Sequence, residues 1–285
     1  GGGPIGVKAA LALHKRGKKV KLLVASGSIL SQLVADKEAK ILEEHISELG
    51  IEIIKRVSPA KILGPERVEG VETTEGEKIG CQMVIVGKGV NANKDLTKGT
   101  EIQTEYGILV DDHCRTSISN IFAAGDVTQS LDSVRKERWM NALWPLAAEE
   151  GRVAAENIMG EDSVLSPRTS MNSLKIEELG LMCCGLTGAR ERVEGSEEIL
   201  LRGAGKWDYK RFVFKDDRLI GYVLIGDVSH GGVLTSLVCR QVDVGRVKRQ
   251  FWSGKYDFAS MLPLIRENKE SFAQPEYREV LAFCG

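Results

Sequence analysis

The sequence has no excess of charge of either sign and no long apolar run. Its 285 residues carry 39 basic and 40 acidic side chains, for a formal net charge of -1. No global field therefore favours binding to nucleic acid or to an anionic membrane surface. No apolar run reaches the roughly 20 residues that a transmembrane helix requires, and no signal peptide is visible. We expect a cytoplasmic protein with neither nucleic acid nor membrane as a partner.

Cysteine and histidine are few and scattered. Of the six cysteines only Cys183 and Cys184 are close together, and adjacent cysteines lack the C-x-x-C spacing of a redox pair or a zinc knuckle. Because free cysteine is among the most buried residue types, we expect these two to be small core residues. The four histidines show no metal or triad spacing. We predict no metal site, and the sequence leaves the catalytic residues unassigned.

The chain also lacks an initiator Met and a hydrophobic strand before its first glycines. It opens on Gly1-Gly2-Gly3-Pro4-Ile5-Gly6, a G-x-G-x-x-G turn, which is followed by helical spacing over residues 7–16 and a strand over 18–25. In a dinucleotide-binding fold a strand leads into such a turn. We therefore expect the chain to be a fragment that has lost the first strand of this unit and whatever came before it.

The rest of the chain predicts an α/β protein with more than one domain. A helix over residues 35–49 ends at Gly50 and a strand follows over 51–55; residues 57–78 indicate a small antiparallel meander. An apolar strand over 83–86 ends at Gly87-Lys88-Gly89, where glycine allows close approach to a ligand.

Two further segments complete the sequence pattern. Strands over 107–111 and 120–124 lead to Gly125-Asp126, and an amphipathic helix over about 142–159 stops at Gly160. Beyond residue 162 the strands shorten, and residues 209–214, 215–218 and 219–225 form a hairpin pattern. This last part predicts a separate α+β domain.

The order of these motifs resembles the FAD-dependent pyridine nucleotide-disulfide oxidoreductase superfamily over residues 1 to about 160. The C-terminal segments Met171-Asn-Ser-Leu-Lys175 and Arg218 to Asp227 resemble the NADH:rubredoxin reductase and nitrite reductase flavoprotein branch. No His-Pro dipeptide of the glutathione-reductase branch occurs. The resemblance implies a Rossmann-like NAD(P)H-binding domain at 1–94 lacking its first strand, a returning segment of a Rossmann-like FAD-binding domain at 95–163, and a C-terminal α+β domain at 164–285.

The resemblance also implies which residues bind the two cofactors. The glycines of the opening turn would hold the pyrophosphate, Gly89 would pass near the nicotinamide, Asp126 would accept hydrogen bonds from the FAD ribityl chain, and the helix after Trp144-Pro145 would direct N–H groups at the flavin. The full set of expected cofactor-binding residues is Gly1, Gly3, Pro4, Ile5, Gly6, Lys8, Gly87, Gly89, Gly125, Asp126, Trp144 and Pro145.

Two positions depart from the family pattern. Val24 stands where relatives usually carry an acidic residue for the ribose 2′-hydroxyl, and no arginine for a 2′-phosphate is present there, so NADH is only mildly preferred over NADPH. Lys8 replaces the commoner glutamate, and it either contacts cofactor phosphate or is solvated.

These features lead to one main hypothesis and two alternatives. The main one is an FAD-dependent NAD(P)H oxidoreductase that passes hydride from the nicotinamide to flavin, and electrons on to a protein or small-molecule acceptor. A small electron carrier could dock on the basic and aromatic residues 246–252, although an ordinary solvated helix face is the commoner use of such a segment.

The first alternative is a coenzyme A disulfide reductase or NADH oxidase of the same superfamily. It needs a reactive cysteine, which the resemblance places in the missing N-terminal part, and no cysteine of this chain matches it. The second is a non-catalytic nucleotide-binding or assembly module. The resemblance leaves monomer and homodimer both open, and the electron acceptor unidentified.

Overall fold

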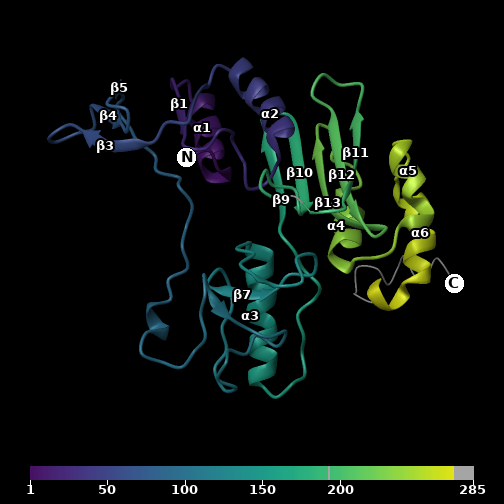
Figure 1. The fold of residues 1–285 in the computed structure, drawn as a ribbon. Helices are drawn as coiled ribbons and strands as arrows, with labels where there is room; N and C mark the ends of the chain where they lie inside the picture. The colour runs from purple at the N-terminus through teal and green to yellow at the C-terminus, as the bar shows by residue number, and fades with distance from the viewer. Residues whose placement is uncertain (192, 273–285) are drawn as a thin grey trace.

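Two parallel strands and two helices form the N-terminal unit. The computed structural model describes residues 1–191 and 193–272 (Figure 1). The unit consists of α1 (Pro4–Lys15), β1 (Lys21–Val24), α2 (Asp36–Glu48) and β2 (Glu52–Lys55). The strands pair in parallel, with Lys21 opposite Glu52. The expected helices and strands of this region are therefore confirmed, and α2 ends at Glu48, two residues before Gly50, whose φ of 93° favours glycine.

A three-stranded antiparallel sheet follows, as the meander pattern predicted. Its strands are β3 (Pro59–Leu63), β4 (Gly70–Thr73) and β5 (Lys78–Gly80), in the order β3-β4-β5. The strand expected over residues 83–86 is wrong. Met83, Ile85 and Val86 are exposed on an extended segment that pairs with no strand of the described residues. An apolar alternating run gives β-propensity, but a strand also needs a neighbour to accept its backbone hydrogen bonds.

The middle of the chain forms a small lobe around α3 (Trp144–Ile158). After the short helix η1 (Asp95–Thr97), β6 (Ile108–Leu109) pairs in parallel with β7 (Thr128–Leu131), which pairs antiparallel with β8 (Arg138–Trp139). The strand expected over 107–111 is reduced to two residues. The one expected over 120–124 is replaced by a single bridge between Arg115 and Phe122, and the chain becomes a strand only after Asp126. The hydrophobic cluster of the lobe is small, with Cys114, Val153 and Ala154 buried and Phe122 and Leu165 packed against them, so little packing supports longer strands.

The C-terminal domain is a five-stranded antiparallel sheet with helices on one face. Its strands are β9 (Met171–Ile176), β10 (Leu179–Gly185), β11 (Glu197–Arg202), β12 (Tyr209–Lys215) and β13 (Arg218–Ile225), in the order β11-β12-β13-β10-β9. The helices are α4 (Gly231–Arg240), η2 (Gly245–Val247), α5 (Lys248–Trp252), α6 (Phe258–Glu267) and η3 (Lys269–Phe272). The predicted hairpin is confirmed: Asp216 and Asp217 both have positive φ in the two-residue turn that joins β12 to β13.

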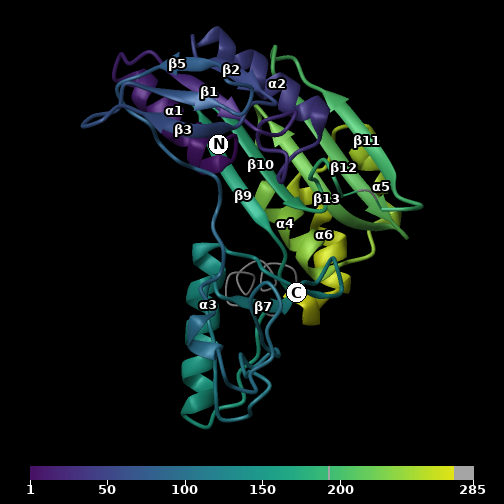
Figure 2. The same ribbon diagram turned by 60° about the vertical axis from the view of Figure 1, so that its left-hand side comes forward.

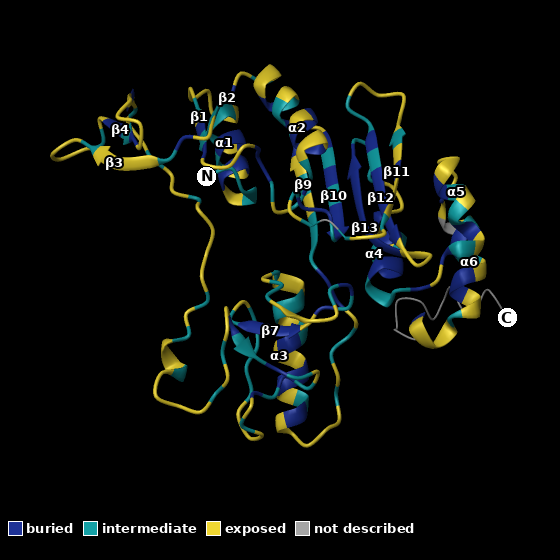
Figure 3. Ribbon diagram, viewed as in Figure 1, coloured by how far each residue is buried: buried dark blue, intermediate teal, exposed yellow. Residues whose placement is uncertain are grey.

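Both faces of this sheet are buried. One hydrophobic cluster joins Tyr222 and Leu224 of β13 to α4, α5 and α6, whereas a second joins Val223 and Ile225 to α1 and α2 of the N-terminal unit. Successive strand residues point to opposite faces, which also places the neighbours Cys183 and Cys184 in different clusters. Both cysteines are buried core residues, as expected. Figures 2 and 3 show α2 beside the C-terminal sheet and β13 buried along most of its length.

Polar contacts cross the same boundary between α2 and the C-terminal domain. Glu38 of α2 is buried and accepts a 2.8 Å hydrogen bond from Arg211 Nε of β12, and Arg211 Nη2 donates to the Thr187 carbonyl at 2.7 Å. Thr187 Oγ1 in turn donates to the Leu33 carbonyl at 2.7 Å. The N-terminal unit and the C-terminal domain therefore share one packed core with a buried ion pair at its margin.

Candidate functional site

The opening glycines form the tight turn at the start of α1. Gly3 is the N-cap residue, with φ of -77° and ψ of 179°, Pro4 occupies the first helical turn, and the Val7 amide donates to the Gly3 carbonyl at 3.0 Å. Helix geometry leaves the amides of Ile5 and Gly6 without an intrahelical acceptor, and the helix dipole adds partial positive charge there. The turn presents the features of an anion-binding helix N-terminus.

The turn is anchored at the carboxyl end of β1. The Gly1 amine donates to the Leu23 carbonyl at 2.9 Å, and the Leu30 amide donates to the Gly2 carbonyl at 2.8 Å. A Cβ atom on Gly2 would lie 2.7 Å from Val24 Cγ1. These contacts place the turn at the sheet edge where open α/β folds bind their ligands.

The structure brings Gly87 to this turn although the expected strand before it does not form. A Cβ atom on Gly1 would lie 2.0 Å from the Gly87 carbonyl oxygen, and one on Gly6 would lie 1.8 Å from the Gly1 oxygen. Packing therefore requires glycine at positions 1 and 6. A Cβ atom on Gly3, by contrast, would meet nothing within 4 Å. Gly89 has a φ of 87° and also faces open space.

Lys8, one of the expected cofactor-binding residues, points its side chain toward the C-terminal sheet. Its Nζ donates to the carbonyl of Lys175 on β9 at 3.4 Å, so its ammonium group faces the C-terminal sheet. Its contact with cofactor phosphate stays a prediction.

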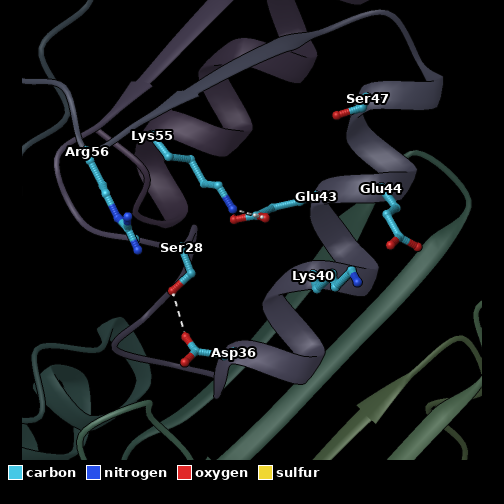
Figure 4. A pocket seen from close by; sticks show the side chains of 9 residues that line it. Ser28, Asp36, Lys40, Glu43, Glu44, Ser47, Lys55 and Arg56 are labelled. Atoms are coloured by element: carbon cyan, nitrogen blue, oxygen red, sulfur yellow. Dashed lines mark hydrogen bonds and ion pairs between the residues drawn. The ribbon is translucent and has the colours of Figure 1, made fainter.

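A cleft of about 570 Å³ opens beside the carboxyl ends of β1 and β2 (Figure 4). It is lined by Gly27, Ser28, Asp36, Lys40, Glu43, Glu44, Ser47, Lys55 and Arg56. Ser28 Oγ donates to Asp36 Oδ1 at 3.3 Å, and Lys55 Nζ contacts Glu43 Oε2 at 2.9 Å. Sequence reasoning missed Arg56, although its position directly after a strand parallel to β1 is a signal that it lies at the same sheet edge.

A second group of expected residues meets in the lobe around α3. Gly125 has a φ of 91°, and a Cβ atom on it would lie 3.8 Å from Ala147 Cβ in the first turn of α3. Asp126 is exposed beside it, and Trp144 at the start of the helix is 83% exposed. The amides of Trp144 and Leu146 lie in the first turn of α3 and therefore have no intrahelical acceptor, and Pro145 between them has no N–H. The structure thus places an exposed carboxylate next to an open helix N-terminus.

Glu150 holds this group together, and the sequence reasoning did not identify it. Its buried carboxylate accepts hydrogen bonds from the Gly125 amide at 2.8 Å, from Thr128 Oγ1 at 2.7 Å and from Ser130 Oγ at 3.0 Å. Arg168 Nη1 lies 3.4 Å from the same carboxylate. The sequence did contain a signal for this role: Glu150 lies two turns before Asn157, on the inward face of an amphipathic helix, where a buried carboxylate needs hydrogen-bond donors.

The two groups of residues lie in different parts of the fold. In Figures 1 and 2 the glycine turn belongs to the N-terminal unit and Gly125-Asp126 to the lobe around α3 and β7, joined by the extended segment 81–94.

Three of the described thiols, those of Cys114, Cys183 and Cys184, are poorly suited to redox chemistry, whereas a hydrogen bond with Cys184 lowers the pKa of the Cys239 thiol. Burial raises the pKa of Cys183 to about 12, and burial, reinforced by the charge of Glu150, raises that of Cys114 to about 12. Burial also raises the pKa of Cys184. A nucleophilic cysteine needs the opposite shift. Within residues 1–191 and 193–272, no three His, Cys, Asp or Glu side chains cluster in a way that could hold a metal ion.

None of the helices formed by these residues has the length and apolar character that a bilayer crossing demands.

Comparison with family models identifies two regions. Residues 1–151 match the pyridine nucleotide-disulphide oxidoreductase model, and residues 171–242 match the rubredoxin NAD+ reductase C-terminal domain.

Known proteins resemble the chain over most of its length. It is 28% identical over 239 residues to an NADH oxidase of Methanocaldococcus jannaschii, covering 79% of this chain and 53% of that protein. It is 26% identical over 238 residues to an NADH-rubredoxin oxidoreductase of Clostridium acetobutylicum, covering 84% of this chain and 56% of that protein. The chain thus spans little more than half the length of these two relatives.

Solved structures share the fold at lower identity. The crystal structure of the covalent putidaredoxin reductase-putidaredoxin complex has a TM-score of 0.77 at 21% identity, covering 96% of this chain and 63% of that one. The NAD-dependent persulfide reductase from A. fulgidus has a TM-score of 0.78 at 21% identity, covering 86% of this chain and 49% of that one.

Proposed function

The chain belongs to the pyridine nucleotide-disulphide oxidoreductase family, and on this basis we propose that it carries the NAD(P)H-binding part and a portion of the FAD-binding part of an FAD-dependent NAD(P)H oxidoreductase. The proposal divides the chain into a nicotinamide-nucleotide domain at 1–94, an FAD-domain segment at 95–163 and a C-terminal domain at 164–285. Its location is the cytoplasm, which the free thiols of the described cysteines support.

The observation that carries the proposal is the open space at Gly3. Its φ of -77° is available to any residue, and no neighbouring atom lies within 4 Å of a Cβ atom built on it. Neither backbone conformation nor internal packing therefore requires glycine at this position. A ligand that must approach the backbone closely would require it, as a dinucleotide pyrophosphate does at this point of the G-x-G-x-x-G turn.

Different residues of the N-terminal unit would bind different parts of the nicotinamide nucleotide. The amides of Ile5 and Gly6 would hold the pyrophosphate, with Gly1, Gly6 and Gly87 allowing the turn, helix and loop to pack closely. Gly89 would leave room beside the nicotinamide.

The lobe around α3 fits the flavin half of the site. Asp126 is free to accept hydrogen bonds from a ribityl chain, and the first turn of α3, at Trp144 and Pro145, would stabilise negative charge on a bound ring. Glu150 of α3 accepts a hydrogen bond from the Gly125 amide, and so holds the turn that carries Asp126 against the helix. When bound, FAD supplies a redox group that takes a hydride from the nicotinamide and passes electrons onward.

The electron acceptor in this proposal is a small carrier protein or a small molecule. The match of residues 171–242 to a rubredoxin reductase domain supports a carrier of the rubredoxin kind. Docking of such a carrier on residues 246–252 stays part of the proposal: Arg249 and Trp252 of this segment are exposed, whereas two of its other basic residues already have partners. Arg246 pairs with Glu267 and Lys248 with Glu197 and Asp217, and α5 packs on the sheet face opposite α1.

The test replaces Gly3 by alanine and measures nucleotide binding to the 285-residue chain by isothermal titration calorimetry. Gly3→Ala should leave the melting temperature within about 2 °C of the parent and weaken NAD(P)+ binding at least roughly tenfold. Gly232→Ala is the matched control, because Gly232 also lies at a helix N-terminus with nothing within 4 Å of a Cβ atom.

Two results would count against the proposal. If the parent chain does not bind NAD(P)+, the turn does not bind a nicotinamide nucleotide. The same conclusion follows if Gly3→Ala binds NAD(P)+ as tightly as the parent does. With flavin bound, the protein should lose its flavin absorbance on anaerobic mixing with NADH or NADPH, and a flavin unchanged by both would favour the non-catalytic module.

A further inference from the structure

Arg56 lies over the carboxyl end of β1, where β1 itself offers no side chain that could distinguish one nucleotide from another. It follows β2, which runs parallel to β1, and its amide donates to the Ser26 carbonyl at 3.4 Å. Its Nε lies 4.0 Å from the position that a Cβ atom on Gly27 would take. In Figure 4 the guanidinium group points toward Ser28, which also lines the cleft. Arg56 adopts a φ of 60°, so a non-glycine side chain is held in the left-handed region at this point.

The other cation on this strand end is already neutralised. Lys55 Nζ contacts Glu43 at 2.9 Å, and the nearby Asp36 carboxylate accepts the Ser28 hydroxyl at the N-terminus of α2. Arg56 forms no ion pair with any described residue. The cleft thus holds one guanidinium group that is free to bind an anion from solution.

The position of the cleft identifies the part of the nucleotide that would reach it. In a dinucleotide fold the glycine turn binds the pyrophosphate, and the end of the second strand faces the adenosine ribose. Discrimination there depends on whether a carboxylate meets a 2′-hydroxyl or a cation meets a 2′-phosphate. Val24 supplies neither, since its side chain is 1% exposed and packs against Gly2.

We propose that Arg56 binds the 2′-phosphate of the adenosine ribose and makes the protein prefer NADPH to NADH. This inference rests on the proposed function, and it reverses the mild preference for NADH expected from the absence of an arginine beside Val24. A guanidinium group suits this task because its planar N–H groups match the oxygens of a phosphate and it stays charged at all working pH values.

Calorimetric titration of the 285-residue chain with NADP+ and with NAD+ tests the proposal directly. The parent should bind NADP+ at least roughly tenfold more tightly than NAD+. Arg56→Gln should weaken NADP+ binding by about the same factor and leave NAD+ binding unchanged. Arg56→Lys should give an intermediate value, because an ammonium group keeps the charge without the planar geometry.

Two further variants separate binding from folding. Arg56→Gly removes the guanidinium group while relieving the left-handed backbone, so it should lose the NADP+ preference with no loss of melting temperature. Arg67→Gln makes the same charge change at an exposed site on the turn between β3 and β4, and it should bind both nucleotides as the parent does.

The outcomes distinguish this inference from the function on which it rests. If NAD+ binds as tightly as NADP+, or if Arg56→Gln weakens both nucleotides equally, the role of Arg56 is overturned while the nucleotide-binding function stands. If the parent chain binds neither nucleotide, the proposed function fails and the inference fails with it.

Discussion

Arg211 should be among the most sensitive positions for stability, because it neutralises a buried carboxylate across the boundary between α2 and the C-terminal sheet. The Glu38 side chain is 0% exposed and its partner 7% exposed. Arg211→Met would leave Glu38 buried without a cation, and Glu38 Oε2 already lacks a hydrogen-bond partner within the described part of the chain.

The expected cost follows from this burial. Removing one partner of a buried ion pair costs about 3–5 kcal/mol, a large share of the roughly 5–15 kcal/mol that stabilises a folded protein. Glu38→Met should cost less, because Arg211 keeps Glu198 at 3.1 Å and that carboxylate is about half exposed. The double variant Glu38→Met with Arg211→Met should lie within about 1 kcal/mol of the parent, since matched apolar side chains replace a buried pair with little loss.

Urea unfolding at pH 7, followed by far-ultraviolet circular dichroism, measures these free energies. The matched control is Lys206→Gln. It breaks a second ion pair between the same two parts of the protein, Lys206 with Glu48 at 2.6 Å, where both side chains are more than half exposed. This change should cost less than about 1 kcal/mol. The reasoning is refuted if Arg211→Met costs no more than Lys206→Gln, or if the double variant is as unstable as Arg211→Met.

Other substitutions test the two halves of the site and one surface pair. Gly6→Ala places a methyl group 1.8 Å from the Gly1 carbonyl oxygen, so thermal unfolding should show a loss of about 1–3 kcal/mol or more; an unchanged melting temperature would contradict this packing. Glu150→Ala removes the acceptor of three hydrogen bonds and should cost roughly 2–4 kcal/mol and weaken FAD binding, whereas full stability would show that the Gly125 turn is held by other contacts. The hydrogen bond from Lys210 lowers the pKa of Asp227 from its ordinary 3.8, so the stability that the pair contributes is fully present above 3.8 and is lost as the pH falls from there through the lowered pKa. Asp227→Asn should therefore cost up to about 1 kcal/mol at pH 7 in urea unfolding and progressively less as the pH is lowered below 3.8, and a difference that stays constant down to the lowest pH would argue against the pair.

Local features of this protein follow closely from its residues. The helix predicted over 35–49 forms as Asp36–Glu48 and stops at Gly50, and the hairpin predicted around residues 215–218 turns at Asp216 and Asp217. Both rest on side-chain periodicity and on turn chemistry within a few residues, which a single segment carries by itself.

Strands were predicted less well where the partner was uncertain. Residues 83–86 and 120–124 have the apolar character of strands, yet neither lies beside a strand that accepts its hydrogen bonds. Strand formation depends on a neighbour that can be far away in the chain, so composition alone cannot decide it.

For the site, the sequence by itself determined the residue types: glycines at 1, 3 and 6, the Gly125-Asp126 turn and the proline at the start of α3. Only the tertiary structure decided which distant residues join them. Parallel pairing of β1 with β2 brings Arg56 to Gly27, and packing of α2 on the C-terminal sheet brings Arg211 to Glu38 from 173 residues away. These juxtapositions depend on how apolar faces are buried against one another, and that free energy belongs to the whole fold and to no single segment.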